Sequence, residues 1–130
     1  MNKKLFLAVA DKLDSLSGTR ARLYDQTAIF SELRPCGTVH CIGGWAIEVE
    51  AERQRKSYRN FLGDRSPSIV AAELMGLSGI SRADGRRLFL ANFMARATPQ
   101  QVAKRLREFV KAGRIRFRKS DFPLETGDEL

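Results

Sequence analysis

Hydrophobic side chains recur every three or four positions in the first sixteen residues, which is the spacing of an amphipathic helix. The residues with this spacing are Leu5, Phe6, Val9, Leu13 and Leu16. The pattern predicts a helix over residues 3–16 that stops near Gly18 and turns its apolar face to the core. From Thr19 to Pro35 there is no clear period, and we expect a loop containing one turn of helix.

A second helical pattern follows Thr38, a residue type that often caps helices. The residues on its apolar face are Val39, Ile42, Gly43, Ala46 and Val49. They predict a central helix over residues 39–54. Because Gly43 and Gly44 each cost about 1 kcal/mol of helix propensity relative to alanine, we expect another backbone or a ligand to approach them closely.

Three further helices are predicted from cap residues. Ser66 followed by Pro67 begins one, and Ser81 with Asp84 begins the next. The strongest signal is Thr98, Pro99 and Gln101, a cap, a first-position proline and a capping-box partner for a helix over residues 99–112 that Gly113 closes. The inward-facing residues expected for these helices are Ile69, Val70, Leu74, Leu77, Leu88, Phe89, Phe93, Val102, Ala103, Leu106, Phe109 and Val110.

The chain after the last helix changes its pattern. The run RIRFRK alternates basic and apolar residues with period two, which predicts a short strand or an extended arm. The acidic end, residues 120–130, is expected to be a flexible tail. The predicted fold class is therefore all-α, a single domain of about five helices over residues 1–119 that includes a basic C-terminal arm.

The net charge and the cysteine content narrow the range of functions that fit this sequence. The 130 residues carry a formal net charge of +8, which draws polyanions by long-range attraction. Two cysteines do not make a disulfide scaffold. No apolar run approaches the roughly 18 residues that a membrane span needs, and the short apolar run after Lys3 and Lys4 predicts an N-terminal helix of a cytoplasmic protein rather than a signal peptide.

The basic residues gather in two clusters. Eight lysines and arginines lie between Lys104 and Lys119, against Glu108 alone. A second cluster follows the central helix, with Tyr58 and Phe61 as stacking candidates. The residues predicted to bind nucleic acid or a partner are Arg53, Arg55, Lys56, Arg59, Lys104, Arg107, Lys111, Arg114, Arg116 and Arg118. The cations of such surfaces neutralise phosphates, and their aromatic rings stack on bases. The alternative is that these cations are solvated and form ion pairs with Glu50, Glu52 and Glu108.

The stretch RPCGTVHCIGGWA holds both cysteines and the only histidine and tryptophan. A zinc site would need a fourth ligand beside Cys36, His40 and Cys41. A catalytic thiol could use Cys36 with His40, although no carboxylate nearby orients the histidine. We favour a structural joint without metal or cofactor, formed by Cys36, Gly37, Thr38, Cys41, Gly43, Gly44 and Trp45.

The segment CGTVHCIGGWA resembles the C-G-T-x-x-C-I-A-G-W/H-A signature of a family of small, largely uncharacterised proteins of bacteria and tailed phages. The later segments AAELMGLSGISRADGRRLFL and TPQQVAKRLREFV are similar to that family too, so the resemblance covers about residues 36–112. Gly43 departs from its commoner alanine, and the basic arm departs from its usual pattern. The resemblance implies a protein that acts in a bacterial host cell and that is encoded by the bacterium or by a phage.

The segment AAELMGLSGISRADGRRLFL also resembles a DNA-binding helix-turn-helix, with Ala72 and Gly76 at the usual spacing. That alignment places Arg82 and Gly85 where the second helix needs buried apolar residues. We therefore expect a plain helical hairpin.

Together these observations predict a small noncatalytic protein that binds nucleic acid or a nucleoprotein complex through its C-terminal helix and arm. One alternative, which comes from the resemblance to phage proteins, is a phage-encoded accessory or counter-defence inhibitor, similar to an anti-CRISPR protein, that binds a host protein complex. The other alternative is a cysteine-dependent enzyme.

Overall fold

The computed structural model describes residues 1–16, 18, 42–77, 88, 93–94 and 97–122. These residues form five α-helices and no strand, which confirms the all-α prediction. The helices are α1 (Lys3–Asp14), α2 (Ile42–Arg53), α3 (Tyr58–Leu62), α4 (Pro67–Leu74) and α6 (Pro99–Ala112), followed by the short 3-10 helix η3 (Lys119–Asp121). The predicted loop at residues 19–35 and the predicted helix after Ser81 lie outside the described residues, apart from Leu88 and Phe93, which are buried.

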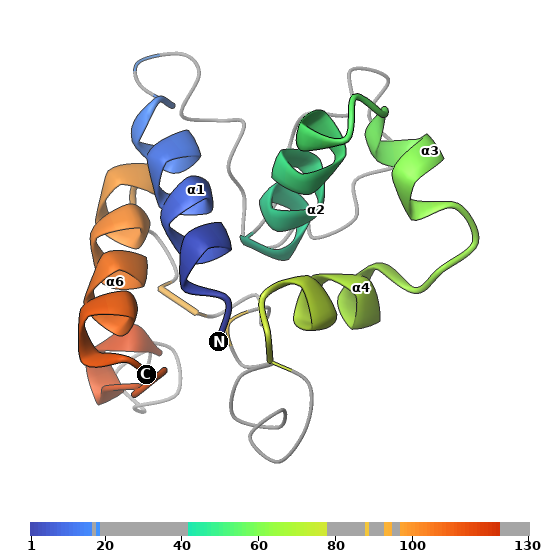
Figure 1. Cartoon of the computed structure of the whole chain (residues 1–130). Coiled ribbons are helices and arrows are strands. Elements are labelled where there is room, and N and C mark those ends of the chain that lie inside the picture. The colour runs from blue at the N-terminus through green and yellow to red at the C-terminus, as the bar shows by residue number, and fades with distance from the viewer. Residues whose placement is uncertain (17, 19–41, 78–87, 89–92, 95–96, 123–130) are drawn as a thin grey trace, which may run out of the picture.

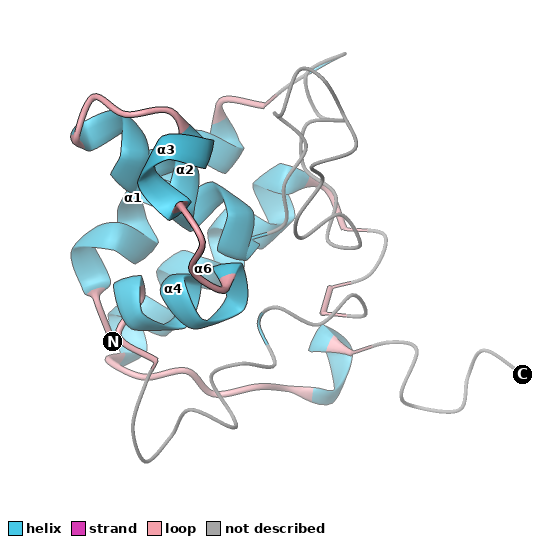
Figure 2. Ribbon diagram, turned by 90° about the vertical axis from the view of Figure 1, so that its right-hand side faces the viewer, coloured by secondary structure: helices cyan, strands magenta, loops and turns pink. Residues whose placement is uncertain are grey.

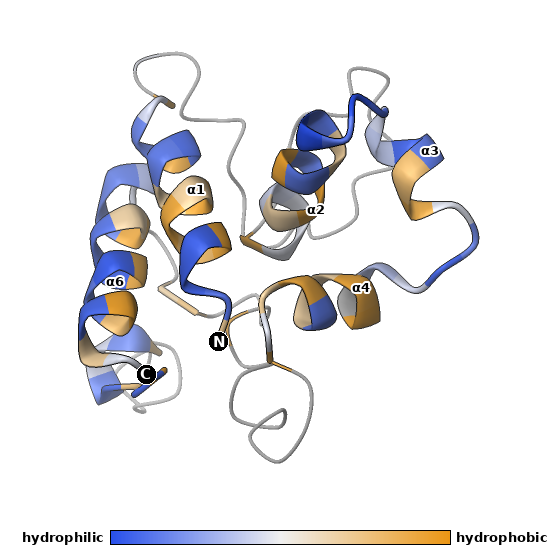
Figure 3. Cartoon of the chain, viewed as in Figure 1, coloured by the Kyte–Doolittle hydropathy of each residue, from blue (hydrophilic) through white to orange (hydrophobic). Residues whose placement is uncertain are grey.

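Helices α1 and α6 pack side by side and run in opposite directions (Figure 1). The five apolar positions of the N-terminal stretch are all buried, as are Val102, Leu106 and Phe109 of α6. At one end of the pair, Gln100 donates a hydrogen bond from Nε2 to the Leu16 carbonyl at 2.6 Å. The colours of Figure 3 alternate along both helices, as expected where one face of each is polar and the other meets the core.

Helix α2 lies beside α1 and contacts both α1 and α4 (Figure 1). Its first six residues, Ile42 to Ile47, are all buried, so the central packing role predicted for this helix is confirmed. Trp45 is 3 % exposed, and the Lys12 ammonium lies 5.6 Å from the centre of its ring. The glycines at positions 43 and 44 are thus part of the interior, where a small side chain lets neighbouring elements pack closely.

The N-terminus is tied to the end of α4. The Asn2 side chain accepts a hydrogen bond from the Leu5 N–H and donates one to the Leu74 carbonyl, and the Asn2 N–H donates to the Met75 carbonyl at 2.8 Å. Gly76 makes this approach possible, because it has φ of +71° and its hydrogen faces the backbone of residues 1 and 2. The cap of α1 therefore also joins α1 to α4.

Helix α6 has the ends that its sequence predicts. The Thr98 hydroxyl accepts from the Gln101 N–H at 3.2 Å, while the Gln101 side chain accepts from the Thr98 N–H at 2.8 Å. Pro99 occupies the first turn, and Gly113 follows the last turn in the left-handed conformation. Both ends of α6, which carries four basic residues, are therefore set by local hydrogen bonds.

We expect Thr98→Ala to destabilise the protein by about 1 kcal/mol, because it removes the hydroxyl that satisfies an N-terminal N–H of α6. Urea unfolding followed by circular dichroism measures this. The Thr98→Ser variant keeps the hydroxyl and should unfold at nearly the wild-type midpoint. An alanine variant with an unchanged midpoint would show that the capping box does not contribute.

Gly76→Ala should destabilise the protein more than Gly113→Ala. Both glycines have positive φ, so alanine costs about 1–2 kcal/mol at either position. At Gly76 the added Cβ would also lie 2.7 Å from the Asn2 nitrogen, whereas at Gly113 its nearest neighbour is the Lys3 ammonium at 3.9 Å. Thermal unfolding of the two variants compares them, and equal losses would contradict the tight N-terminal contact.

Candidate functional site

The segment after α6 turns back over the helix that precedes it. Gly113 donates to the Val110 carbonyl at 3.1 Å, and the Arg114 N–H donates to the Phe109 carbonyl at 3.2 Å. This pair of bonds is the Schellman arrangement that ends a helix and reverses the chain. Residues 114–118 then run as an extended loop to η3 (Figure 2). The period-two pattern of RIRFRK thus corresponds to an extended arm, and residues 114–118 are not part of a strand.

A buried ion pair holds this arm against α6. Arg105 is 6 % exposed and Asp121 is 2 % exposed. The Arg105 guanidinium donates to both carboxylate oxygens of Asp121, at 2.9 and 2.8 Å, and to the Arg116 carbonyl at 2.6 Å. The Asp121 carboxylate also accepts from the Arg118 N–H at 2.8 Å. We call Arg105, Asp121 and these bonds the latch.

The latch corrects two features of the picture drawn from the sequence. The eight cations counted between Lys104 and Lys119 include Arg105, whose charge is used inside the protein rather than at its surface. The expected tail begins at residue 120, yet Asp121 and Phe122 are both buried. The packed chain therefore extends to Phe122, because a paired carboxylate and an aromatic ring are held in the core.

Four aromatic rings pack beside the latch. Phe117 meets Phe93, Phe109 and Phe122 edge-to-face, with ring centres 5.8, 5.9 and 5.2 Å apart. The Arg105 guanidinium lies 4.3 Å from the centre of the Phe109 ring. Such pairs favour one mutual orientation of the rings. The arm is thus anchored by apolar contacts as well as by the ion pair.

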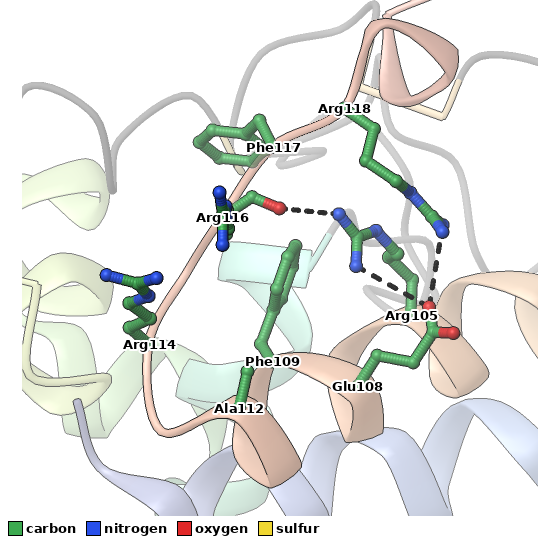
Figure 4. A pocket seen from close by; sticks show the side chains of 8 residues that line it. All are labelled: Arg105, Glu108, Phe109, Ala112, Arg114, Arg116, Phe117 and Arg118. Atoms are coloured by element: carbon green, nitrogen blue, oxygen red, sulfur yellow. Dashed lines mark hydrogen bonds and ion pairs between the residues drawn. The ribbon is translucent and has the colours of Figure 1, made fainter.

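A pocket of about 370 Å³ lies between the C-terminal half of α6 and the arm. Phe109, Ala112 and Phe117 give it apolar walls, and four arginines and one glutamate supply its charges. In Figure 4 the Phe109 side chain stands between Arg114 and Arg116 on one side and Glu108 and Arg118 on the other. The Glu108 carboxylate meets Arg105 and Arg118, each at 3.5 Å. The lining therefore carries excess positive charge.

The predicted binding residues of this region are not equivalent. Lys104, Lys111, Arg114, Arg116 and Arg118 are exposed. Arg107 instead joins α6 to α1 through ion pairs of 2.8 Å to Asp11 and 2.5 Å to Asp14. Hydrogen bonds to Asp11 and Asp14 raise the pKa of Arg107 above its ordinary value. Its charge is thus largely compensated by α1, and it is a weaker candidate than its neighbours.

The second basic cluster lies apart from the first. Arg53, Arg55, Lys56 and Arg59 are exposed around the turn from α2 to α3, on the side of the molecule away from α6 (Figure 1). Arg53 pairs with Glu50, and its hydrogen bond holds the pKa of that carboxyl below the ordinary value. The two clusters do not form one continuous surface.

The aromatic residues expected to serve the second cluster are also less available than the sequence indicates. Phe61 is buried and lies under the Arg65 guanidinium, whose central carbon is 5.0 Å from the ring centre. Tyr58 is half-buried. The stacking role predicted for Phe61 is therefore wrong, because its ring is enclosed by the protein itself.

Most of the cysteine stretch lies outside the described residues. Cys36, Gly37, Thr38 and Cys41 belong to that part, so the metal, thiol and structural interpretations of these residues stay predictions. Gly43, Gly44 and Trp45 are buried in α2. Within the described ranges, no group of three or more histidine, cysteine, aspartate or glutamate side chains is arranged to hold a metal ion.

Of the residues that line the pocket, the sequence prediction of binding residues included Arg114, Arg116 and Arg118; it missed Arg105, Glu108, Phe109, Ala112 and Phe117. A signal for Phe117 is present, since it alternates with Arg114, Arg116 and Arg118 and an apolar residue at that period faces the protein. No comparable signal separates Arg105 from the exposed cations around it.

No family model, curated protein or solved structure matches this chain. None of the described helices is both long and apolar enough to cross a membrane.

Removing one partner of the latch should be costly, because it leaves a charge buried without compensation. We expect Asp121→Ala to lower the free energy of unfolding by about 3–5 kcal/mol. The exposed Asp64 offers a matched control, since Asp64→Ala changes the net charge equally and should alter stability by less than about 0.5 kcal/mol. Urea unfolding of both variants tests this, and similar midpoints for the two would contradict a structural role for the latch.

Proposed function

We propose that this protein is a noncatalytic binding protein that contacts nucleic acid through α6 and the arm at residues 114–118. One observation carries the proposal: Arg114 and Arg116 are exposed beside an apolar-walled pocket while the backbone between them and η3 is fixed by the latch. Cations held by an ordered backbone lose less freedom on binding than cations on a loose tail.

The cations extend along one face of the helix pair. Lys104 and Lys111 are seven residues apart on α6, so they lie on the same face about 10 Å apart along the helix axis. Lys3 of α1 adds an ammonium next to Gly113. Among the described residues, neither Lys104 nor Lys111 has an ion-pair partner. These charges are available for phosphates.

The mechanism is electrostatic positioning. Lysine and arginine side chains neutralise phosphates and release the cations condensed around the nucleic acid, which makes the affinity fall as salt rises. Contacts of this kind fix where the backbone lies without reading a sequence. The proposed activity is therefore binding with strong salt dependence and without a preferred base sequence.

A pair of charge-matched variants tests this proposal. Lys111→Glu combined with Arg114→Glu reverses two charges of the proposed surface. Lys56→Glu combined with Arg59→Glu reverses two charges of the other cluster and changes the net charge equally. The first variant should bind more weakly and show a shallower salt slope, by about 0.9 on duplex DNA and about 0.7 on single strands for each phosphate that the protein no longer neutralises.

Fluorescence anisotropy with labelled single-stranded and duplex oligonucleotides at several salt concentrations measures both quantities. Circular dichroism should show that both variants keep the wild-type helix content. Equal weakening by the two variants would mean that only the net charge matters. Absence of binding by the wild-type protein at low salt would overturn the proposed function.

A further inference from the structure

The pocket between α6 and the arm has a composition that suits one kind of ligand. Its apolar walls come from Phe109, Ala112 and Phe117, and its charged side chains are mostly arginines. We propose that it accepts one unstacked base of a single-stranded nucleic acid, while the arginines around it hold the flanking phosphates. This inference rests on the proposed function and adds a preference for single strands.

The size of the pocket agrees with this ligand. The pocket is open to solvent, and its volume of about 370 Å³ falls near the lower end of the range for small-molecule sites. One nucleotide is a ligand of that class, whereas a duplex is far too wide to enter. In a duplex the faces of the bases are covered by neighbouring bases, so only an unpaired strand can offer a base to such a pocket.

The side chains provide stacking surfaces. Phe117 is half-buried and its ring is held by three edge-to-face contacts, so its orientation is set before a ligand arrives. Arginine guanidinium planes also stack on bases, and Arg116 and Arg118 line the same pocket as Phe117. A base inserted here would leave water for an aromatic surface that is already in place, which favours binding because little further ordering is needed.

The charges favour an anionic ligand with an apolar part. Three exposed arginines, Arg114, Arg116 and Arg118, line the pocket, whereas the fourth, Arg105, is buried and paired with Asp121. The single glutamate of the lining already meets Arg105 and Arg118. Cationic ligands are therefore disfavoured. An acidic peptide would satisfy the arginines but would leave the aromatic wall without a flat partner. A nucleotide satisfies both features, since the phosphates and the base are separate parts of one ligand.

The test compares labelled twelve-nucleotide single strands that carry the same number of phosphates. One is a mixed-sequence oligonucleotide, and the other has its central nucleosides replaced by abasic residues. The intact strand should bind wild-type protein about 5- to 150-fold more tightly than the abasic strand, the difference expected for one stacked base. It should also bind more tightly than a duplex of equal length. DNA and RNA versions are measured separately, and discrimination in either supports the proposal.

Two aromatic-to-leucine variants locate the effect. Phe117→Leu keeps an apolar side chain in the arm but removes the ring, so the intact and abasic strands should then bind alike. Tyr58→Leu removes a half-buried ring beside the other basic cluster and should leave the discrimination unchanged. If Phe117→Leu fails to fold, the wild-type comparison of intact and abasic strands still decides the proposal.

The outcomes separate this inference from the proposed function. Salt-dependent binding in which intact and abasic strands bind equally would overturn the base pocket and leave the proposed function standing. No binding of any nucleic acid would overturn both. A third outcome is that poly-glutamate competes as strongly as the intact strand and that the abasic strand binds as tightly as the intact one. That result would overturn the base pocket and indicate that the ligand is an acidic peptide.

Discussion

The buried ion pair between Arg105 and Asp121 determines where the last described part of the chain lies. A guanidinium and a carboxylate removed from water each lose several kcal/mol of hydration free energy, and only close and complete hydrogen bonding compensates for that loss. Here the two groups meet through two bonds, Arg105 also donates to the Arg116 carbonyl and to Glu108, and Asp121 also accepts from the Arg118 N–H. The pair therefore specifies the position of the arm more than it adds to stability.

The candidate site depends on that position. If the arm were not held on α6, Arg114, Arg116 and Arg118 would be cations on a flexible chain. Their alternation with Phe117 would then not fix the positions of the charges relative to the ring. With the arm held on α6, Phe117 packs against Phe93, Phe109 and Phe122, and the arginines surround the pocket beside it. One buried pair thus converts a basic stretch of sequence into an ordered surface with an apolar centre.

Other cations among the described residues also fall into two groups, those held in ion pairs within the protein and those exposed without such a pair. Arg107 joins α6 to α1 through Asp11 and Asp14, and Arg53 is held by Glu50. These two arginines count among the 23 lysines and arginines of the chain, but a ligand would have to compete with carboxylates for them. The number of basic residues therefore overstates the number of cations that a polyanion can meet, and the arrangement of ion pairs decides which cations remain available.

The sequence by itself determined the helices whose ends and faces are local. Thr98, Gln101 and Gly113 bond to groups three or four residues away, and the apolar positions of α1 repeat at the helical period, so both features can be read without knowing the rest of the fold. The tertiary structure decided which cations are buried and where the basic clusters lie. Arg105 and Asp121 are sixteen residues apart, and the clusters belong to different helices. Their relative positions depend on how helices pack, which no short stretch of sequence specifies.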